Sequence, residues 1–344
     1  MKRNPVGLAL FCAAVAGAAP LENLGSGQTG RIEFQSSTPD SRFAVIRGQL
    51  GASVTVFGDL LMPTQKTTEK VPAVVFSHGS EGVSSLYFDV WAKALNTAGY
   101  AVFVVDSFKP RNEDRVTGPI KQLTWKTTAN LADALNALKL IATHPQIDAH
   151  RIYHMGWSRG GQVVLDAAWP TYQQHIVPGN VKWAGSIAIY PGCNMRYRVD
   201  EHGKLPAPLL LMLGEKDDLT LPKPCMEYAD ELASEGNPVA YKVYAGATHV
   251  FDRLNQPWRK YQEGNYNACS MDVRMPYGAA DPKWRPAVDK YSGKSFPTPQ
   301  EWSDYLPKCQ QTSWTTVESN PKAREQAVRD AIEFLNSQSV TEKF

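Results

Sequence analysis

The sequence predicts an α/β fold in which helices cover both faces of a mostly parallel central sheet. Short apolar, β-rich segments alternate with helical patterns along most of the chain, which is typical of strand–helix–strand units. Several of the strand segments are continuous apolar runs, as strands buried on both faces require. The 344 residues are 43% hydrophobic and 20% charged, and no internal repeat or low-complexity linker divides them. We therefore expect one globular domain after the N-terminal segment.

The expected elements follow one another along the chain. The predicted strands share an apolar, β-rich composition and cover residues 53–62, 72–76, 101–105, 151–155, 181–190, 208–213 and 239–244. A helix capped by Ser84 or Ser85 is expected to bury Phe88, Trp91 and Leu95, which are spaced at three and four residues. Further helices are expected near residues 131–138, over 160–169, and from Pro321 onward with Asn320 as the N-cap.

Residues 253–318 break this alternation. They hold 7 of the 24 prolines and 10 of the 35 aromatic residues, without sustained periodicity. A segment this long without regular structure is functional or disordered, and its aromatic content and two cysteines argue against disorder. We expect an ordered insertion pinned by a disulfide. Whether it walls a pocket or decorates the surface stays open at this point.

The first eighteen residues predict a secretory signal peptide. Lys2 and Arg3 precede a short apolar stretch, residues 8–16, which ends in an A-x-A pattern at Ala18. Cleavage there removes two cations and no acid, so the 36 Lys and Arg fall to 34, equal to the 34 Asp and Glu. No later segment reaches about 18 uninterrupted apolar residues. We expect an exported protein, periplasmic or extracellular, without stable membrane insertion and without the basic excess that nucleic-acid binding needs.

Four cysteines remain after this cleavage. An even number in an oxidising compartment indicates two disulfides, for which three connectivities are possible. We favour Cys193–Cys225 and Cys269–Cys309, because each pair brackets one structural neighbourhood. Four reduced, buried cysteines are the alternative. A zinc site is not expected, since no CxxC or clustered Cys/His spacing occurs.

The strongest local motif is the run Gly156-Trp157-Ser158-Arg159-Gly160, between a predicted strand and a predicted helix. This is the context of a nucleophile elbow, a strained turn that presents a serine hydroxyl above the sheet. A serine of ordinary pKa needs an adjacent base, itself oriented by an acid, and in this arrangement serine, acid and histidine follow in that order. His249, in the loop after the last predicted strand, is the expected base.

Two aspartates compete for the role of the acid. Asp217 and Asp218 both lie in the loop after the strand at 208–213, where a strand end can aim a carboxylate at His249. We favour Asp217, the third residue after Gly214, and Asp218 remains the alternative.

An oxyanion hole needs two backbone amides near the nucleophile. The amide of Arg159 is expected to supply one, and the amide of Ser80 or of Gly79, in the loop after the strand at 72–76, the other. His78 is expected to brace this loop with its side chain.

Few residues point to the substrate or to a cofactor. Trp157, beside the nucleophile, and the Ser107-Phe108 pair, after the strand that ends at Asp106, are expected to line or underlie the pocket. Arg159 and Arg111 could attract a substrate carboxylate, although such arginines more often form salt bridges. Two other histidines, His150 and His154, lie four residues apart, and a structural role is expected for them rather than a metal pair. We expect no metal and no cofactor, since no Gly-rich phosphate loop occurs.

Together these segments resemble the dienelactone hydrolase family of α/β hydrolases, over about residues 50–252 and 320–337. The matching pieces are His78-Gly79, Gly99-Tyr100 before a strand that ends at Asp106, residues 156–161, Tyr190-Pro191-Gly192-Cys193, Gly214 to Asp218, and Ala247 to Phe251. The resemblance implies an α/β-hydrolase domain over residues 19–344, with the insertion at about 253–318. The founding enzymes of the family use a cysteine nucleophile and a glutamate in the oxyanion loop. Ser158 and Gly79 stand there in this chain, which implies a serine esterase rather than action on dienelactone.

The sequence therefore predicts an exported serine hydrolase that cleaves small-molecule or polymeric carboxylic esters through an acyl-enzyme. The alternatives are a serine peptidase or a polyester or aromatic-ester hydrolase on the same fold, and a binding protein whose activity has lapsed. The number of subunits stays open.

Overall fold

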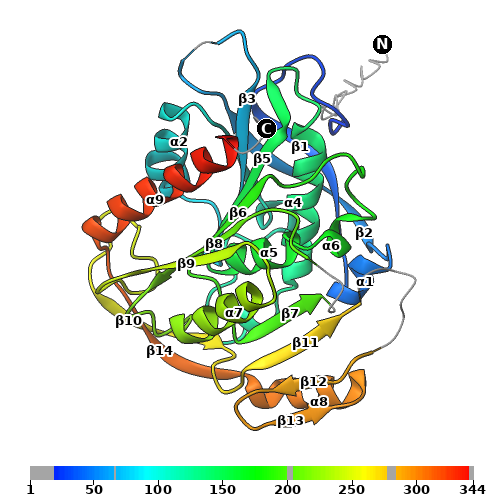
Figure 1. Ribbon diagram of the computed structural model, residues 1–344, viewed down its shortest axis with the longest axis vertical. Helices are drawn as coiled ribbons and strands as arrows, with labels where there is room; N and C mark the ends of the chain where they lie inside the picture. Colours follow the sequence, from blue (N-terminus) through cyan, green and yellow to red (C-terminus); the bar gives the residue numbers. More distant parts are fainter. Residues whose placement is uncertain (1–18, 66, 200–203, 277–283, 341–344) are drawn as a thin grey trace, which may run out of the picture.

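An eight-stranded sheet forms the centre of the protein (Figure 1). The structure is a computed structural model that describes residues 19–65, 67–199, 204–276 and 284–340, so the predicted signal peptide, residues 1–18, lies outside the described residues. The strands, in spatial order, are β1 (Gly30–Thr38), β2 (Ala52–Leu61), β4 (Ala101–Asp106), β3 (Val71–Ser77), β5 (Ile147–Trp157), β6 (Gly185–Ile189), β8 (Leu209–Gly214) and β9 (Val239–Tyr244). From β4 to β9 all neighbours run parallel, whereas β1 and β2 are antiparallel. This is the α/β-hydrolase fold that the sequence predicts.

The seven predicted strands are all present, with ends that differ by a few residues. The fifth begins at Gly185 rather than at residue 181. Strand β1 was missed, because only about half of its side chains are buried and it is rich in polar residues. An edge strand that faces solvent on one side lacks the continuous apolar run of its parallel neighbours.

Two hydrophobic layers hold the helices to the sheet. Alternate residues of β3 point to opposite faces, so Val75 packs in one layer and Phe76 in the other. The first layer includes α4 (Thr127–Ile141), α5 (Arg159–Ala167) and α7 (Pro222–Ser234), and the second includes η1 (Leu86–Ala92), α2 (Lys93–Thr97) and α9 (Pro321–Val340). Figure 1 shows α2 and α9 together, apart from α4 and α5. Shorter helices are α1 (Arg42–Ile46), η2 (Lys109–Arg111), α3 (Lys121–Thr124) and α6 (Pro170–Gln173).

One predicted helix begins differently from expectation. Residues Leu86–Ala92 wind as a π-helix, and the side chain of Ser85 makes no capping hydrogen bond. The backbone of Ser85 is already helical (φ −59°, ψ −23°), whereas a side-chain cap requires an extended residue. Trp91 and Leu95 are nevertheless buried as predicted. At α9 the expected cap is present, because Asn320 Oδ1 accepts the Ala323 amide at 3.0 Å.

The segment 253–318 is ordered where the structure describes it. Its elements are β10 (Arg259–Asn265), β11 (Met271–Met275), β12 (Ala287–Asp289), β13 (Lys294–Phe296), α8 (Pro299–Cys309) and β14 (Gln311–Val317). Strand β10 pairs with β14, and β11 pairs with β7 (Met195–Val199), which belongs to the main domain. The insertion is therefore joined to the domain through a shared sheet, seen at the bottom of Figure 1.

Two disulfides tie loops to helices. Cys193–Cys225 joins the segment after β6 to α7, and Cys269–Cys309 joins the β10–β11 loop to the end of α8. This pairing fits the one expected from the sequence. None of the helices in the described ranges is long and apolar enough to cross a membrane.

Candidate active site

Ser158 stands on a strained turn between β5 and α5. Its backbone has φ 52° and ψ −112°, a conformation that side-chain-bearing residues rarely adopt. The neighbouring glycines allow the turn, since a Cβ on Gly160 would lie 1.9 Å from the Ser77 carbonyl oxygen and one on Gly156 would lie 2.1 Å from the Gly160 carbonyl oxygen. The Ser158 amide donates to the Ile189 carbonyl at 2.8 Å. The geometry is that of a nucleophile elbow.

The structure brings Ser158, His249 and Asp217 into one chain of hydrogen bonds. Ser158 Oγ and His249 Nε2 are 3.1 Å apart, and His249 Nδ1 and Asp217 Oδ2 are 2.7 Å apart. The three residues are 7%, 3% and 3% exposed. Asp217 Oδ1 also accepts the amides of Leu219 (3.0 Å) and Thr220 (2.9 Å), which fixes the carboxylate. Such a chain can move a proton from the hydroxyl to the imidazole and hold the resulting imidazolium.

Asp218, the alternative acid, points away from His249. Its carboxylate binds β14 of the insertion: Oδ1 accepts from Thr315 Oγ1 at 2.9 Å and from the Thr316 amide at 2.8 Å, and Oδ2 accepts from Thr316 Oγ1 at 2.7 Å. The two adjacent aspartates therefore have different partners. Asp217 faces the imidazole, and Asp218 fastens the insertion to the same loop.

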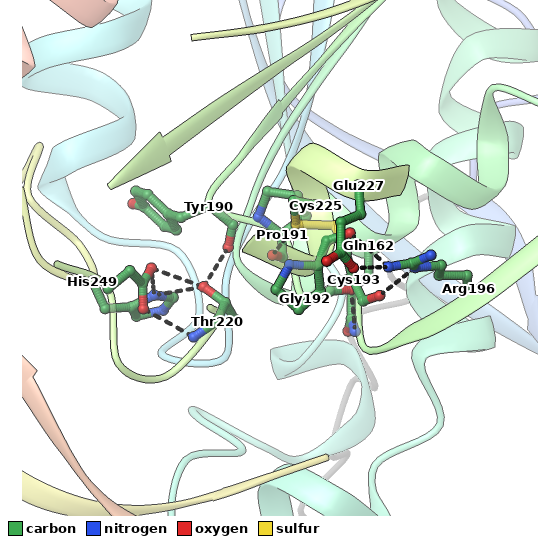
Figure 2. Close-up of a disulfide and its surroundings, with 12 residues drawn as sticks. Gln162, Tyr190, Pro191, Gly192, Cys193, Arg196, Thr220, Cys225, Glu227 and His249 are labelled. Atoms are coloured by element: carbon green, nitrogen blue, oxygen red, sulfur yellow. Dashed lines mark hydrogen bonds and ion pairs between the residues drawn. A yellow bond between two sulfur atoms is a disulfide. The ribbon is translucent and has the colours of Figure 1, made fainter. Parts of the chain in front are cut away.

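Thr220 is a part of the site that the sequence did not reveal. Its hydroxyl donates to Asp217 Oδ2 at 2.8 Å or to the Tyr190 carbonyl at 3.1 Å, and lies 3.1 Å from His249 Nδ1 (Figure 2). The Tyr190 ring in turn packs edge-on against the imidazole, with ring centroids 4.8 Å apart. A threonine three residues after an aspartate is common in turns, so the sequence offered no sign of this role.

The expected oxyanion-hole residues lie side by side. The Gly79 amide donates to the Tyr87 hydroxyl oxygen at 2.9 Å, which leaves the Ser80 amide as the donor available in that loop. The Arg159 amide is in the first turn of α5, where amides have no partner within the helix. Arg159 Nε donates to Ser80 Oγ at 3.1 Å, so the two residues are linked directly.

His78 braces the loop that carries Gly79 and Ser80, as the sequence predicted. Its Nε2 accepts the Ser107 amide at 3.0 Å, so the ring proton is on Nδ1, which donates to the Gly79 carbonyl at 2.8 Å. Burial lowers the pKa of His78, which keeps the ring neutral. Phe108 packs edge-on against this ring at 4.4 Å.

The arginines proposed to attract a carboxylate are both occupied. Arg111 forms an ion pair with Asp133 at 2.8 Å. Arg159 is buried and donates to Ser80, to Thr127 Oγ1 (2.7 Å) and to Gln122 (2.5 Å to its carbonyl oxygen). Because burial without a carboxylate partner disfavours the charge, the pKa of Arg159 falls to about 10.

A fully buried carboxylate, Asp252, connects the loops around Ser158 and His249. Its Oδ2 accepts the indole N–H groups of Trp91 (2.8 Å) and Trp157 (2.9 Å), and its Oδ1 accepts the Tyr190 hydroxyl at 2.7 Å. Burial raises the pKa of Asp252. Trp157 precedes Ser158, and Tyr190 packs on His249, so this single side chain holds both sides of the site.

Two cavities meet at Ser158. The larger has a volume of about 270 Å³ and is bordered by α1, α8, β7 and the β10–β11 loop, so the insertion supplies part of its wall. The smaller, about 30 Å³, is lined by Gly79, Ser80, Tyr87 and His249 among others.

Of the three pocket candidates from the sequence, Trp157 lines the smaller cavity. Ser107 and Phe108 line neither cavity beside Ser158, so they do not form its wall, whereas the other place expected for them, beneath the pocket, stays a prediction. They are buried behind His78 and support the oxyanion loop from below.

Most of the chain is similar to one known protein family. The model of the dienelactone hydrolase family matches residues 58–273. The chain belongs to this family. Membership in the family supports hydrolase activity. It also fits the α/β-hydrolase strand order of the central sheet.

Individual relatives of this dienelactone hydrolase family member are distant. A probable 2-oxo-3-(5-oxofuran-2-ylidene)propanoate lactonase from Bradyrhizobium sp. is 24% identical over 190 residues, which are 54% of this chain and 75% of that protein. A putative dienelactone hydrolase from Klebsiella pneumoniae is 18% identical, with 64% and 88% of the two chains covered and a TM-score of 0.45. Esterase 2 from Thermogutta terrifontis is 16% identical, with 59% and 82% covered and a TM-score of 0.47.

Within the described ranges no group of three or more His, Cys, Asp or Glu side chains is arranged to hold a metal ion. His154, one of the two histidines considered for such a pair, is fully buried, bonds Ser77 Oγ at 2.8 Å and stacks on Trp183 at 4.6 Å. These contacts indicate that His154 has a structural role in the core.

Proposed function

We propose that this protein is an exported serine esterase in which Ser158 is the nucleophile, His249 the general base and Asp217 the residue that orients the imidazole. Ser158 Oγ attacks the ester carbonyl carbon while its proton passes to His249 Nε2. The tetrahedral species then expels the alcohol, which takes the proton from His249, and an acyl group remains on Ser158. Water attacks this acyl group, gives its proton to His249, and the acid leaves as the proton returns to Ser158.

The observation that carries the proposal is the hydrogen-bond chain from Ser158 Oγ to His249 (3.1 Å) and on to Asp217 (2.7 Å). A serine hydroxyl needs a base within about 2.6–3.2 Å to be activated, and the base needs a third group to fix its tautomer. Both distances meet this requirement without any movement of the chain. The burial of all three groups strengthens their interactions, because the local dielectric is low.

The amides of Ser80 and Arg159 support the same reaction. They are proposed to bind the oxyanion, where the loss of one donor typically costs on the order of 3–4 kcal/mol of barrier. Arg159 Nε binds Ser80 Oγ at 3.1 Å and thereby keeps the two amide-bearing residues together.

Fluorophosphonate labelling tests the proposal directly. We expect one adduct on Ser158, located by peptide mass, and none in the Ser158→Ala variant. Asp218→Asn serves as the control, since Asp218 lies in the same loop region but binds β14 instead of His249, and it should be labelled like the wild type. A folded wild-type protein without an adduct would contradict the proposal and favour a binding protein whose activity has lapsed.

A second candidate, a hydrolase of aromatic esters or polyesters, is favoured by the aromatic side chains around the larger cavity. A serine peptidase is the other alternative. Rates on alkyl esters, followed by acid release at constant pH, should exceed rates on aminoacyl amides. Faster cleavage of the amides would favour the peptidase.

Export is part of the proposal. The two disulfides support it, since such bonds persist in oxidising compartments. We expect the mature N-terminus near residue 19 and an intact mass that rises by four hydrogens on reduction of the two disulfides. An uncleaved, fully reduced protein in the cytoplasm would contradict this part.

A further inference from the structure

We propose that the substrate is an ester of an aromatic carboxylic acid with a small alcohol, the aryl acyl group lying in the larger cavity beside Ser158. This inference rests on the proposed function and names the substrate class of that same site. It follows from the sizes of the two cavities, from the side chains that line them, and from the place of His249.

The two cavities differ strongly in size. The larger holds about 270 Å³ and the smaller about 30 Å³. For scale, a cavity of about 150 Å³ can bind benzene, whereas one water needs about 10–15 Å³. An aryl ring and its linker therefore fit the larger cavity, and the smaller one has room for a group of the size of methanol.

The walls of the larger cavity suit a flat apolar ring. Five aromatic side chains from separate parts of the chain line it, and none of the five is fully buried: Phe43, Trp125, Tyr197, Tyr266 and Trp302. A half-buried aromatic residue on a cavity wall retains surface that a ligand can cover, and aromatic pairs gain about 0.5–1.5 kcal/mol beyond area burial. The Tyr197 and Trp302 rings are already in T-shaped contact at 6.4 Å, which keeps this wall in place.

The positively charged groups at this cavity already have partners within the protein, so they offer little attraction to an anionic substituent of a substrate. Arg42 forms an ion pair with Asp166 at 2.7 Å and lies over the Tyr197 ring at 3.8 Å. The N–H groups of Arg159 are donated to protein oxygens, among them Ser80 and Thr127. Both guanidinium groups are engaged before a ligand arrives, and Lys126, which also lines the cavity, forms an ion pair with Asp40 at 2.6 Å, so an uncharged aryl group is the best match.

The place of His249 decides which half of the ester occupies which cavity. His249 Nε2 must protonate the leaving oxygen, so the alcohol lies next to the imidazole. His249 lines the smaller cavity and does not line the larger one. The alcohol therefore occupies the smaller cavity, and the acyl group extends past Ser158 toward Gln162 and Gly192, which Figure 2 shows on the far side of Thr220 from His249.

The smaller cavity cannot easily widen. Its wall includes Trp157 and Tyr87, whose rings are in edge contact at 5.0 Å, and the Trp157 indole N–H is bonded to Asp252 at 2.9 Å. A larger alcohol would have to displace this packed group, and packed interiors resist such overfilling.

A pair of isomeric esters tests the assignment. Methyl phenylacetate carries its ring on the acyl side and benzyl acetate on the alcohol side, and the two leaving alcohols are of nearly equal basicity. We expect kcat/KM at constant pH to be at least about tenfold higher for methyl phenylacetate, the scale that pocket fit usually gives. Equal rates, or a preference for benzyl acetate, would overturn the proposal.

Variants of the aromatic wall supply the second measurement. Trp302→Ala and Tyr266→Ala should each lower kcat/KM for methyl phenylacetate about tenfold more than kcat/KM for methyl acetate, since methyl acetate does not reach the wall. The matched control is Trp314→Ala, a tryptophan of the same insertion that is 60% exposed and lines neither cavity. An effect of Trp314→Ala equal to that of Trp302→Ala would overturn the proposal, as would unchanged aryl-ester rates in both wall variants.

The outcome separates this inference from the proposed function. If Ser158 is labelled by the fluorophosphonate but neither isomer is hydrolysed, or benzyl acetate is preferred, the substrate class is wrong and the serine hydrolase stands. If Ser158 is not labelled in a folded protein, the proposed function itself fails.

Discussion

Removing the Asp252 carboxylate tests whether one buried anchor holds the loops around Ser158 and His249. In Asp252→Ala, three buried donors lose their acceptor: the indole N–H groups of Trp91 and Trp157 and the hydroxyl of Tyr190. A buried donor left without a partner costs about 1–3 kcal/mol. The free energy of unfolding should therefore fall by at least about 3 kcal/mol, and kcat should fall with it, because Trp157 precedes the nucleophile and Tyr190 packs on the imidazole.

Asp252→Asn should be much milder. The amide oxygen can keep both tryptophan bonds, while its NH₂ group faces the Tyr190 hydroxyl, which can accept instead of donate. We expect a loss of about 1 kcal/mol in stability and a decrease of less than about tenfold in kcat. The two substitutions thus separate the hydrogen bonds of Asp252 from its charge.

Asp330→Ala is the matched control. Asp330 is also a buried carboxylate with several donors, namely Lys242 (2.7 Å), Gln326 (2.9 Å) and Tyr244 (3.0 Å), but it bonds to no residue of the proposed triad. Urea unfolding followed by far-ultraviolet circular dichroism, together with kcat and KM on an alkyl ester, distinguishes the two anchors. The reasoning is refuted if Asp252→Ala unfolds like the wild type, or if Asp330→Ala lowers kcat as much as Asp252→Ala does.

Three further predictions concern other parts of the site and core. Asp217→Asn should lower kcat by about 10³–10⁴-fold, because the imidazole loses its orienting carboxylate, whereas Asp218→Asn should leave kcat within about threefold and lower the urea midpoint; ester kinetics and unfolding curves check both. Burial lowers the pKa of His154 to about 3, so below about pH 6.5 the unfolded chain takes up a proton that the native state does not. Stability should fall by on the order of 4 kcal/mol between about pH 6.5 and 3, and His154→Gln should flatten that part of the unfolding profile. Tyr87→Phe removes the acceptor of the Gly79 amide and should lower kcat about tenfold with little change in KM. The control is Tyr100→Phe, which directly precedes β4 at the end of that strand away from the site, and it should change neither kcat nor KM.

The parts of the site that depend on local chain geometry could be predicted from the sequence. The elbow at Ser158 is set by residues 156–160, since the glycines are needed for contacts within a few residues and with β3. Asp217 and His249 each follow a strand of the parallel sheet, and the carboxyl ends of parallel strands meet at one edge. The order of these three residues along the chain was therefore enough to predict that they lie close together.

The supporting contacts could not be found in this way. Asp252 binds Trp91, a residue 161 positions away, and Trp157, 95 positions away. No periodicity or motif records such a contact, because it depends on how two loops and a helix pack in three dimensions. The contacts of Ser107 and Phe108 have the same origin: both residues follow a strand end near the site, but only the packing in three dimensions shows that they contact the ring of His78.

The insertion also contacts the loops of the proposed triad, which its composition did not suggest. Strand β14 binds the acid loop through Asp218, whose partners are Thr315 and Thr316, and forms a parallel bridge to the histidine loop between Val317 and His249. Three consecutive residues of the insertion thus contact the loops that carry Asp217 and His249. The wall of the larger cavity begins in the partner strand β10, whose last residues, Gly264 and Asn265, line it. One β-ribbon thus contacts the loops that carry Asp217 and His249 on one side and borders the larger cavity on the other.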